Sequence, residues 1–209
     1  GWTNAKGTIE IPTDAHLAVQ WFDQRLDAAA VEVADLFSKY RLSEALMLVY
    51  KLFWDEFSSW YLEMVKPAYG QPIDKKTYES TLHFFDVLLR QLHPFMPFIT
   101  EEIYCTLLPE EESIMISDWP VYKDEWNSPE AELAIGSFQE VVRGIRNTRN
   151  EMNVPQNRKT NIYIVGKDAE CCARFESCKK SFTNLAFAKE IHVQQDKNGI
   201  GEDAVSIVV

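Results

Sequence analysis

Apolar residues recur at alternating intervals of three and four near the start of the chain, and this period is the feature that most constrains the fold. Between residues 14 and 40 the apolar positions are separated by steps of 4, 3, 4, 3 and 4. This spacing places them on one side of an α-helix, which must then pack along its whole length. These positions are Phe22, Leu26, Ala29, Val33, Leu36 and Tyr40. The chain is therefore expected to bury long helices against one another.

The same period predicts four more helices. The second covers residues 42–66 and is stopped by Pro67, which lacks a backbone donor. The third begins after the capping residue Asp74 and runs to residue 92, the fourth covers about 98–108, and the fifth covers about 129–153. Five long helices joined in this way predict an antiparallel bundle.

The second helix is expected to be central because it carries two apolar stripes. One stripe is Leu42, Leu46, Val49, Phe53, Phe57, Trp60 and Met64. The other stripe is Tyr50, Trp54, Tyr61 and Val65. Two adjacent stripes make a face that is wide enough to contact helices on both sides.

The pattern changes after Pro155. Residues 161–165, 190–193 and 204–209 are rich in β-branched residues and predict strands, whereas 168–188 has a helical pattern. The fold class is therefore mainly α: a connector over residues 1–12, an antiparallel helical bundle over 13–155, and a small α/β segment over 156–209.

Charge is distributed unevenly along the chain. The net charge of −11 argues at first against a nucleic-acid partner, but residues 101–132 hold ten acids and one base. Residues 137–160 hold five bases and two acids, so a local basic surface remains. The four cysteines and four histidines do not fall at zinc-ligand spacing, so we expect reduced thiols, no metal site and a cytoplasmic location.

Motifs of catalysis and of membrane spanning are missing from the sequence. It has no Gly-rich phosphate loop, no nucleophile elbow and no apolar run long enough to cross a bilayer. Glu101 and Glu102 lie near a helix start, where their negative charges interact favourably with the helix dipole. This structural role is a better explanation for the pair than acid–base chemistry. No residue is predicted to be catalytic.

Three stretches carry a family resemblance: FWDEFSSWYLEMVKP at residues 53–67, LHPFMPFITEEIY at 92–104 and IRNTRNEMNVP at 145–155. In this order they resemble the motifs of the valyl-tRNA synthetases, a family of class I aminoacyl-tRNA synthetases. Ser58 and Ser59 depart from the family pattern, where Cys-Asp is usual. The resemblance implies the class Ia anticodon-binding domain, in a C-terminal fragment of a longer enzyme.

The resemblance also implies what this longer enzyme does. It would be a valine–tRNA ligase that attaches valine to tRNA(Val) using ATP and Mg, and its catalytic domain, editing domain and C-terminal coiled coil would lie outside this chain. The chain itself would hold no cofactor. Its partner would be the anticodon stem-loop of tRNA(Val), with no DNA or membrane partner, and it would be a monomer.

Unpaired anticodon bases are read by stacking on flat side chains and by hydrogen bonds to their edges, while phosphates require Lys or Arg. The fifth helix offers such groups opposite its apolar residues (Ala134, Phe138, Val141, Ile145 and Met152). The candidate tRNA-binding residues are Trp21, Arg25, Lys51, Trp54, Arg143, Arg146, Asn147, Arg149 and Asn150.

Three alternatives stay open at this point. The polar face of the fifth helix could be a solvated surface or could form salt bridges within the bundle. Trp21 could be a core residue rather than a stacking platform. The whole chain could be a helical protein–protein interaction domain, or the equivalent domain of an isoleucyl-type synthetase.

Overall fold

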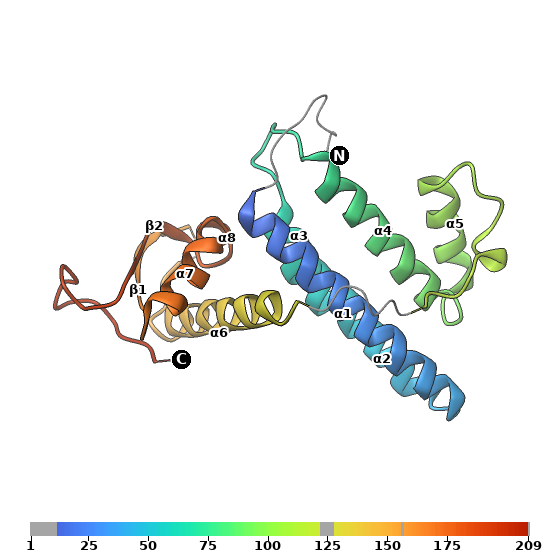
Figure 1. The fold of residues 1–209 in the computed structure, drawn as a ribbon, viewed down its shortest axis with the longest axis horizontal. Coiled ribbons are helices and arrows are strands. Elements are labelled where there is room, and N and C mark those ends of the chain that lie inside the picture. Colours follow the sequence, from blue (N-terminus) through green and yellow to red (C-terminus); the bar gives the residue numbers. More distant parts are fainter. Residues whose placement is uncertain (1–11, 122–127, 156, 209) are drawn as a thin grey trace. The chain divides into compact units, whose positions relative to one another are not determined.

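A computed structural model describes residues 12–121, 128–155 and 157–208 (Figure 1). The expected connector over residues 1–12 lies outside the described residues, except for Pro12. The chain divides into two compact units, of which the first holds Val19–Ser128 and the second holds Pro12–Ala18 and Pro129–Val209. The helix that starts at Pro129 thus groups with the small α/β segment, and a domain boundary at residue 155 stays a prediction.

The first unit consists of helices, as the apolar period predicted. The mainly α fold with a small α/β segment is confirmed. Helix α1 begins before this unit, and its residues from Val19 onward belong to it. The elements are α1 (Thr13–Ser38), α2 (Leu42–Lys51), η1 (Leu52–Tyr61), α3 (Leu62–Val65), α4 (Lys75–Leu92), α5 (Pro97–Leu107) and the short 3₁₀ helix η2 (Ile114–Ile116).

A cluster of aromatic rings forms the centre of the first unit. The ring centroid of Phe22 on α1 lies 5.2 Å from those of Phe57 and Tyr61 on η1 and 5.2 Å from that of Phe84 on α4. Tilted ring pairs at this distance add stabilisation beyond the area that they bury. The cluster therefore holds α1, η1 and α4 around one core.

The continuous helix from Leu42 to Val65 changes its period in the middle, because η1 is a π-helix. Its last turn closes with a bond from Leu62 N to the Phe57 carbonyl, five residues back. Ser58 Oγ and Ser59 Oγ also donate to carbonyls five residues back, at 3.0 and 2.9 Å. Such long π segments are unusual, since most π-helical stretches are single-turn bulges.

The π-helix breaks the second apolar stripe. Tyr61 and Val65 are buried, but Tyr50 and Trp54 are 54% and 59% exposed, so the expectation of one continuous stripe is wrong. A bonding interval of five residues advances each residue by a smaller angle than an interval of four does. Positions that share a face of an α-helix therefore separate across η1.

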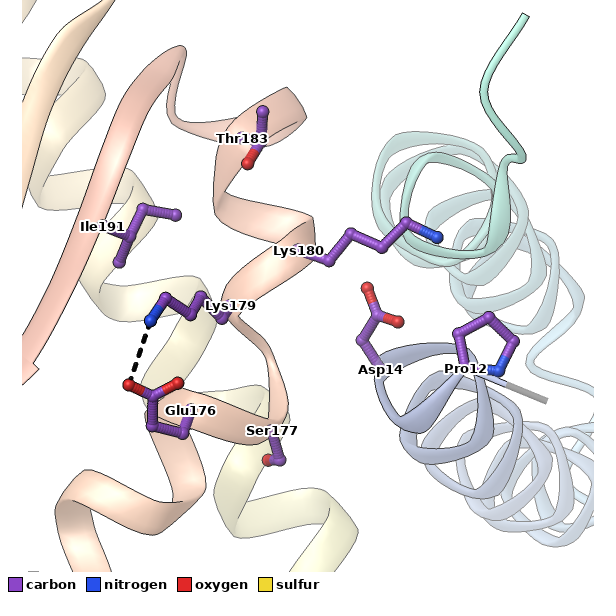
Figure 2. Close-up of a pocket in the computed structure, with 8 residues that line it drawn as sticks. All are labelled: Pro12, Asp14, Glu176, Ser177, Lys179, Lys180, Thr183 and Ile191. Carbon is purple, nitrogen blue, oxygen red and sulfur yellow. Dashed lines mark hydrogen bonds and ion pairs between the residues drawn. The ribbon is translucent and has the colours of Figure 1, made fainter. Parts of the chain in front are cut away.

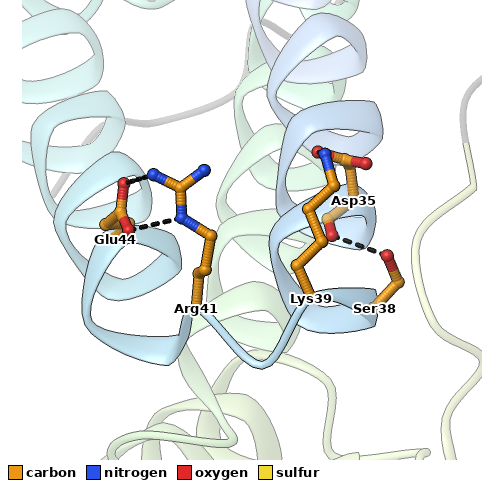
Figure 3. A network of polar contacts seen from close by, with 5 residues as sticks. All are labelled: Asp35, Ser38, Lys39, Arg41 and Glu44. Atoms are coloured by element: carbon orange, nitrogen blue, oxygen red, sulfur yellow. Dashed lines mark hydrogen bonds and ion pairs between the residues drawn. The ribbon is translucent and has the colours of Figure 1, made fainter.

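The turn between α1 and α2 explains a second difference from the expected pattern. Tyr40 is not part of the buried seam: it is 88% exposed, with a φ of 58° just after α1 ends. Arg41 N donates to the Leu36 carbonyl at 2.9 Å, which closes a left-handed helix cap. Around this turn Lys39 pairs with Asp35, and Arg41 pairs with Glu44 (Figure 3).

The second unit contains a long helix and a small parallel sheet. Strands β1 (Thr160–Val165) and β2 (Ala188–Gln194) pair in parallel. Two helices, α7 (Ala169–Ser177) and α8 (Lys179–Leu185), form the crossover that a parallel pair needs, in place of the single helical stretch expected. The long helix is α6 (Pro129–Glu151).

The strand expected over residues 204–209 is wrong for the part that is described. Residues 204–208 are exposed and pair with no strand, and the described sheet has two strands. A β-branched run favours extended backbone, but a strand also needs a neighbour with which to exchange hydrogen bonds. Residue 209 lies outside the described residues.

The buried face of α6 is rotated from the one expected. Ala134 and Phe138 are buried, and the ring centroid of Phe138 lies 4.6 Å from that of Phe182 on α8. However, the fully buried valine is Val142 and not the expected Val141, and Met152, which was also expected on the apolar side, is exposed. The rotation brings Arg149 onto the buried side of the helix.

Candidate nucleic-acid interface

A groove of about 480 Å³ lies between α1 and the α2–η1 helix, entirely within the first unit. It brings together Arg25 and Lys51, two of the candidate residues, which come from different helices. Its charged lining is Arg25, Arg41, Lys51, Glu32, Glu44 and Glu56. The groove thus offers cations and carboxylates in equal number.

Two of the three cations are held by carboxylates. Arg25 donates to Glu56 through Nε at 2.7 Å and through its second terminal nitrogen at 2.8 Å, a geometry that fixes the plane of the guanidinium group. Arg41 pairs with Glu44, and this hydrogen bond together with the charge of Glu44 raises the pKa of Arg41. Lys51 is exposed at the rim and makes no ion pair within the described part of the chain.

The two candidate tryptophans differ in exposure. Trp21 is 4% exposed, and its ring centroid lies 5.9 Å from that of Phe22 in an edge-on contact, so it belongs to the core of this conformation. Trp54 projects from η1 with more than half of its surface exposed. A base could stack on Trp54 without any rearrangement, and RNA contact by either residue stays a prediction.

Helix α6 presents a second polar surface, in the other unit. Arg143, Asn147 and Asn150 are exposed and lie at helical intervals of four and three, so they share one face. Arg146, one turn from Arg143, is half-buried, and its Nε donates to the Leu185 carbonyl at the end of α8, at 2.8 Å. The side chains exposed on this face are therefore one guanidinium group and two amides.

Arg149 is buried and bonded to backbone rather than presented to solvent. It is 8% exposed, and its terminal nitrogens donate to Thr160 Oγ1 at 3.1 Å and to the carbonyls of Pro155 and Arg158 at 3.0 and 2.6 Å. Its guanidinium carbon lies 5.5 Å from the ring centroid of Phe187. In this conformation Arg149 holds the connection between α6 and β1, and any RNA contact by it stays a prediction.

The second unit also contains a pocket of about 440 Å³, which none of the candidate residues lines. Figure 2 shows Asp14 from the first turn of α1, Glu176 from α7 and the lysines 179 and 180 from α8 around it. Lys179 pairs with Glu176 at 3.1 Å, and Asp14 accepts a hydrogen bond from Ser181 at 3.0 Å. Opposite charges line this pocket, so it does not select for an anion.

The described residues form neither a metal-ligand cluster nor a membrane-spanning helix. Among them, no three His, Cys, Asp or Glu side chains lie close enough to one another to hold a metal ion. In the same part of the chain, no helix combines the length and the apolar character needed to cross a bilayer.

Comparison with known proteins decides the family. A family model described as the anticodon-binding domain of tRNA ligase matches residues 19–164, well over half of the chain. The chain belongs to this family. The matched range includes the groove in the first unit and the exposed face of α6.

Several curated relatives share this anticodon-binding region. A valine–tRNA ligase of Bacteroides fragilis is 55% identical over 166 residues, which cover 79% of this chain and 19% of the relative. A valine–tRNA ligase of Phocaeicola vulgatus is 48% identical, covering 95% of this chain and 22% of the relative. One from Clostridium tetani is 39% identical, covering 93% and 22%. The chain thus spans about a fifth of the length of these relatives.

The comparisons confirm the resemblance to valyl-tRNA synthetases that the three motifs indicated. They do not favour the alternative of a general protein–protein interaction domain. The individual binding residues are a separate matter, because a family match assigns no contact to any side chain. The geometry described above is what distinguishes exposed candidates from buried ones.

Proposed function

We propose that this anticodon-binding domain recognises the anticodon stem-loop of tRNA(Val) as part of a longer valine–tRNA ligase. The observation that carries the proposal is the family match over residues 19–164, together with the names of the relatives. The exposed cations and amides of both units lie inside this range.

The exposed side chains contact different parts of the RNA according to their chemistry. Lys51 and Arg143 are exposed cations that bind phosphates, which supply most of the affinity for nucleic acid. Asn147 and Asn150 are exposed amides, each of which can donate and accept hydrogen bonds at a base edge. Arg25, held in plane by Glu56, presents a fixed flat surface at the groove.

The chemistry of the longer protein belongs outside this chain. We place ATP, Mg and the catalytic and editing functions in the part of the polypeptide that these residues do not cover, because the family match is to an anticodon-binding domain and the chain spans about a fifth of the length of its relatives. The domain then contributes positioning and specificity. We also propose that the protein acts as a monomer in the cytoplasm, where tRNA is charged.

The test is a binding titration of the 209-residue chain with anticodon stem-loops of valine and isoleucine tRNA, at salt from about 50 to about 200 mM. The valine stem-loop is expected to bind more tightly, and its affinity is expected to fall as salt rises. The logarithmic slope should be about 0.7 per phosphate contact on a single strand.

Two variants sharpen this test. Arg143→Ala should weaken both stem-loops alike and reduce the salt slope, whereas Asn147→Ala should reduce the preference for the valine stem-loop. Lys189→Ala, an exposed lysine on β2, is the control for a general loss of positive charge. Equal affinity for both stem-loops and for an unrelated hairpin would contradict the proposal.

A further inference from the structure

Four residues make one exposed surface on the outer side of the α2–η1 helix. Met47, Tyr50, Lys51 and Trp54 are all exposed. Met47 is three and four residues before Tyr50 and Lys51, and Trp54 is four and three residues after them, which makes the four residues neighbours on a helix. We name this surface the outer face. Met47 and Lys51 also line the groove, so the outer face is continuous with it.

The two aromatic rings of the outer face lack the partners that their neighbours have. Phe57 is in ring contact with Phe53 at 5.9 Å and with Tyr61 at 5.5 Å, as part of the central cluster. Neither the Tyr50 nor the Trp54 side chain makes a ring contact or a hydrogen bond within the described part of the chain. A tyrosine and a tryptophan exposed together mark a surface on which another molecule packs.

The π-helix is what separates these rings from the core. It turns Phe57 and Tyr61 inward while Trp54 stays outward, although the sequence spacing of an α-helix would place Trp54 and Tyr61 on one face. The hydroxyls of Ser58 and Ser59 support this geometry through their bonds to the carbonyls of Phe53 and Trp54. π-Helical segments are frequent at functional sites.

We propose that Tyr50 and Trp54 are stacking platforms for unpaired bases of the RNA loop, with Lys51 between them in the sequence binding the phosphate that joins those bases. This inference rests on the proposed function and adds the place and the means of contact. Unpaired bases stack on exposed aromatic side chains, and a nearby cation holds the backbone. The carboxylates of Glu44 and Glu56 do not oppose a phosphate as free charges, because Arg41 and Arg25 hold them.

The experiment measures binding of the valine anticodon stem-loop to the 209-residue chain and to the variants Tyr50→Ala and Trp54→Ala. Each variant should bind about 5- to 150-fold more weakly, the range observed for loss of one stacking platform. The dependence on salt should stay unchanged, since neither ring carries charge. Lys51→Ala should instead lower the logarithmic salt slope by about 0.7.

Three controls separate stacking from unfolding. Tyr69→Ala removes a fully exposed tyrosine from another part of the same unit and should leave binding unchanged. Trp54→Phe keeps a ring and should retain most of the affinity. Circular dichroism should show the same helix content and the same unfolding midpoint in all of these variants.

The outcomes separate this inference from the proposed function. A wild-type chain that binds the stem-loop, with Tyr50→Ala and Trp54→Ala binding equally well, would overturn the stacking inference alone. A wild-type chain that fails to bind the stem-loop would overturn both. The inference would be supported if Tyr50→Ala and Trp54→Ala both bind the stem-loop more weakly, while Trp54→Phe and Tyr69→Ala retain most of the wild-type affinity.

Discussion

Replacement of Arg149 by alanine is expected to destabilise the second unit by about 2–4 kcal/mol. The side chain makes three charge-assisted hydrogen bonds, to Thr160, Pro155 and Arg158, and each such bond contributes about 1.5–3 kcal/mol. Part of this free-energy cost is offset in the alanine variant, because Pro155 and Arg158 are exposed and water can replace the guanidinium group at their carbonyls. The loss of the contact with Phe187 adds to the cost.

The assay must report on the second unit by itself. The described tryptophans all lie in the first unit and none lies in the second, so tryptophan fluorescence serves as the readout of the first unit. Hydrogen exchange of peptides from residues 140–155 and 157–165 in increasing urea reports on the α6–β1 connection. At a urea dependence of about 1 kcal/mol/M, the midpoint of exchange should fall by about 2 M or more, while the fluorescence transition stays in place.

Two comparison variants define the mechanism. Arg149→Lys keeps the charge but lacks the planar guanidinium group that donates to several acceptors at once. Its urea midpoint should therefore lie between those of Arg149→Ala and the wild type. Asn147→Ala, on the exposed face of the same helix, should change the midpoint little. If Arg149→Ala and Asn147→Ala gave the same midpoint, the assignment of Arg149 to the α6–β1 connection would be refuted.

Three further predictions follow from local geometry. Tyr40→Gly should stabilise the first unit by about 0.5–1 kcal/mol in a urea titration, because glycine adopts the positive φ of 58° without a steric penalty; an unchanged or lower midpoint would contradict this. Asp74→Ala should cost about 1 kcal/mol in the same titration, since Asp74 caps α4 by accepting from Thr77 N at 2.8 Å, whereas Asp74→Asn should retain most of the stability. Burial raises the pKa of the Cys178 thiol to about 11, so at pH 8 about one in a thousand is ionised, and iodoacetamide should label it far more slowly in the native chain than in urea, as read by mass spectrometry; equal labelling in both states would contradict this.

The sequence predicted the helices well because their signals are local. The apolar period located α1, α4, α5 and α6 to within a few residues, and Asp74 acts as the cap that its position indicated. The strand at 204–208 was predicted wrongly because strand formation depends on a partner that lies elsewhere in the chain. Local preference for extended backbone could not supply that partner.

The position of Arg149 shows how the helical face of α6 was misread. Phe138, Val142 and Arg149 are separated by intervals of four and seven, so they share a face whose buried character the sequence does indicate. The positive charge of Arg149 instead placed it among the candidate tRNA-binding residues. A buried arginine becomes favourable only where the fold offers several acceptors at once, and the carbonyls of Pro155 and Arg158 come into reach only through the turn after α6.

Exposure of Tyr50 could not be predicted from the α-helical period, because the period itself changes at Leu52. The single local signal is the pair Ser58 and Ser59, whose hydroxyls can bond to carbonyls of the preceding turn. Serine forms such bonds in ordinary α-helices too, so the pair indicates no particular bonding interval. The phase of the helix is decided by the packing of Phe57 and Tyr61 in the core.

The π-helical stretch also limits how the length of this segment can vary. Deleting one residue between Leu52 and Tyr61 would allow the ordinary interval of four to re-form, and the helix on one side of the deletion would then rotate by roughly 100° relative to the other. Either Tyr61 would leave the core or Trp54 would enter it. Among homologous chains, the residue count of this segment is therefore expected to vary only together with the residues at positions 54 and 61.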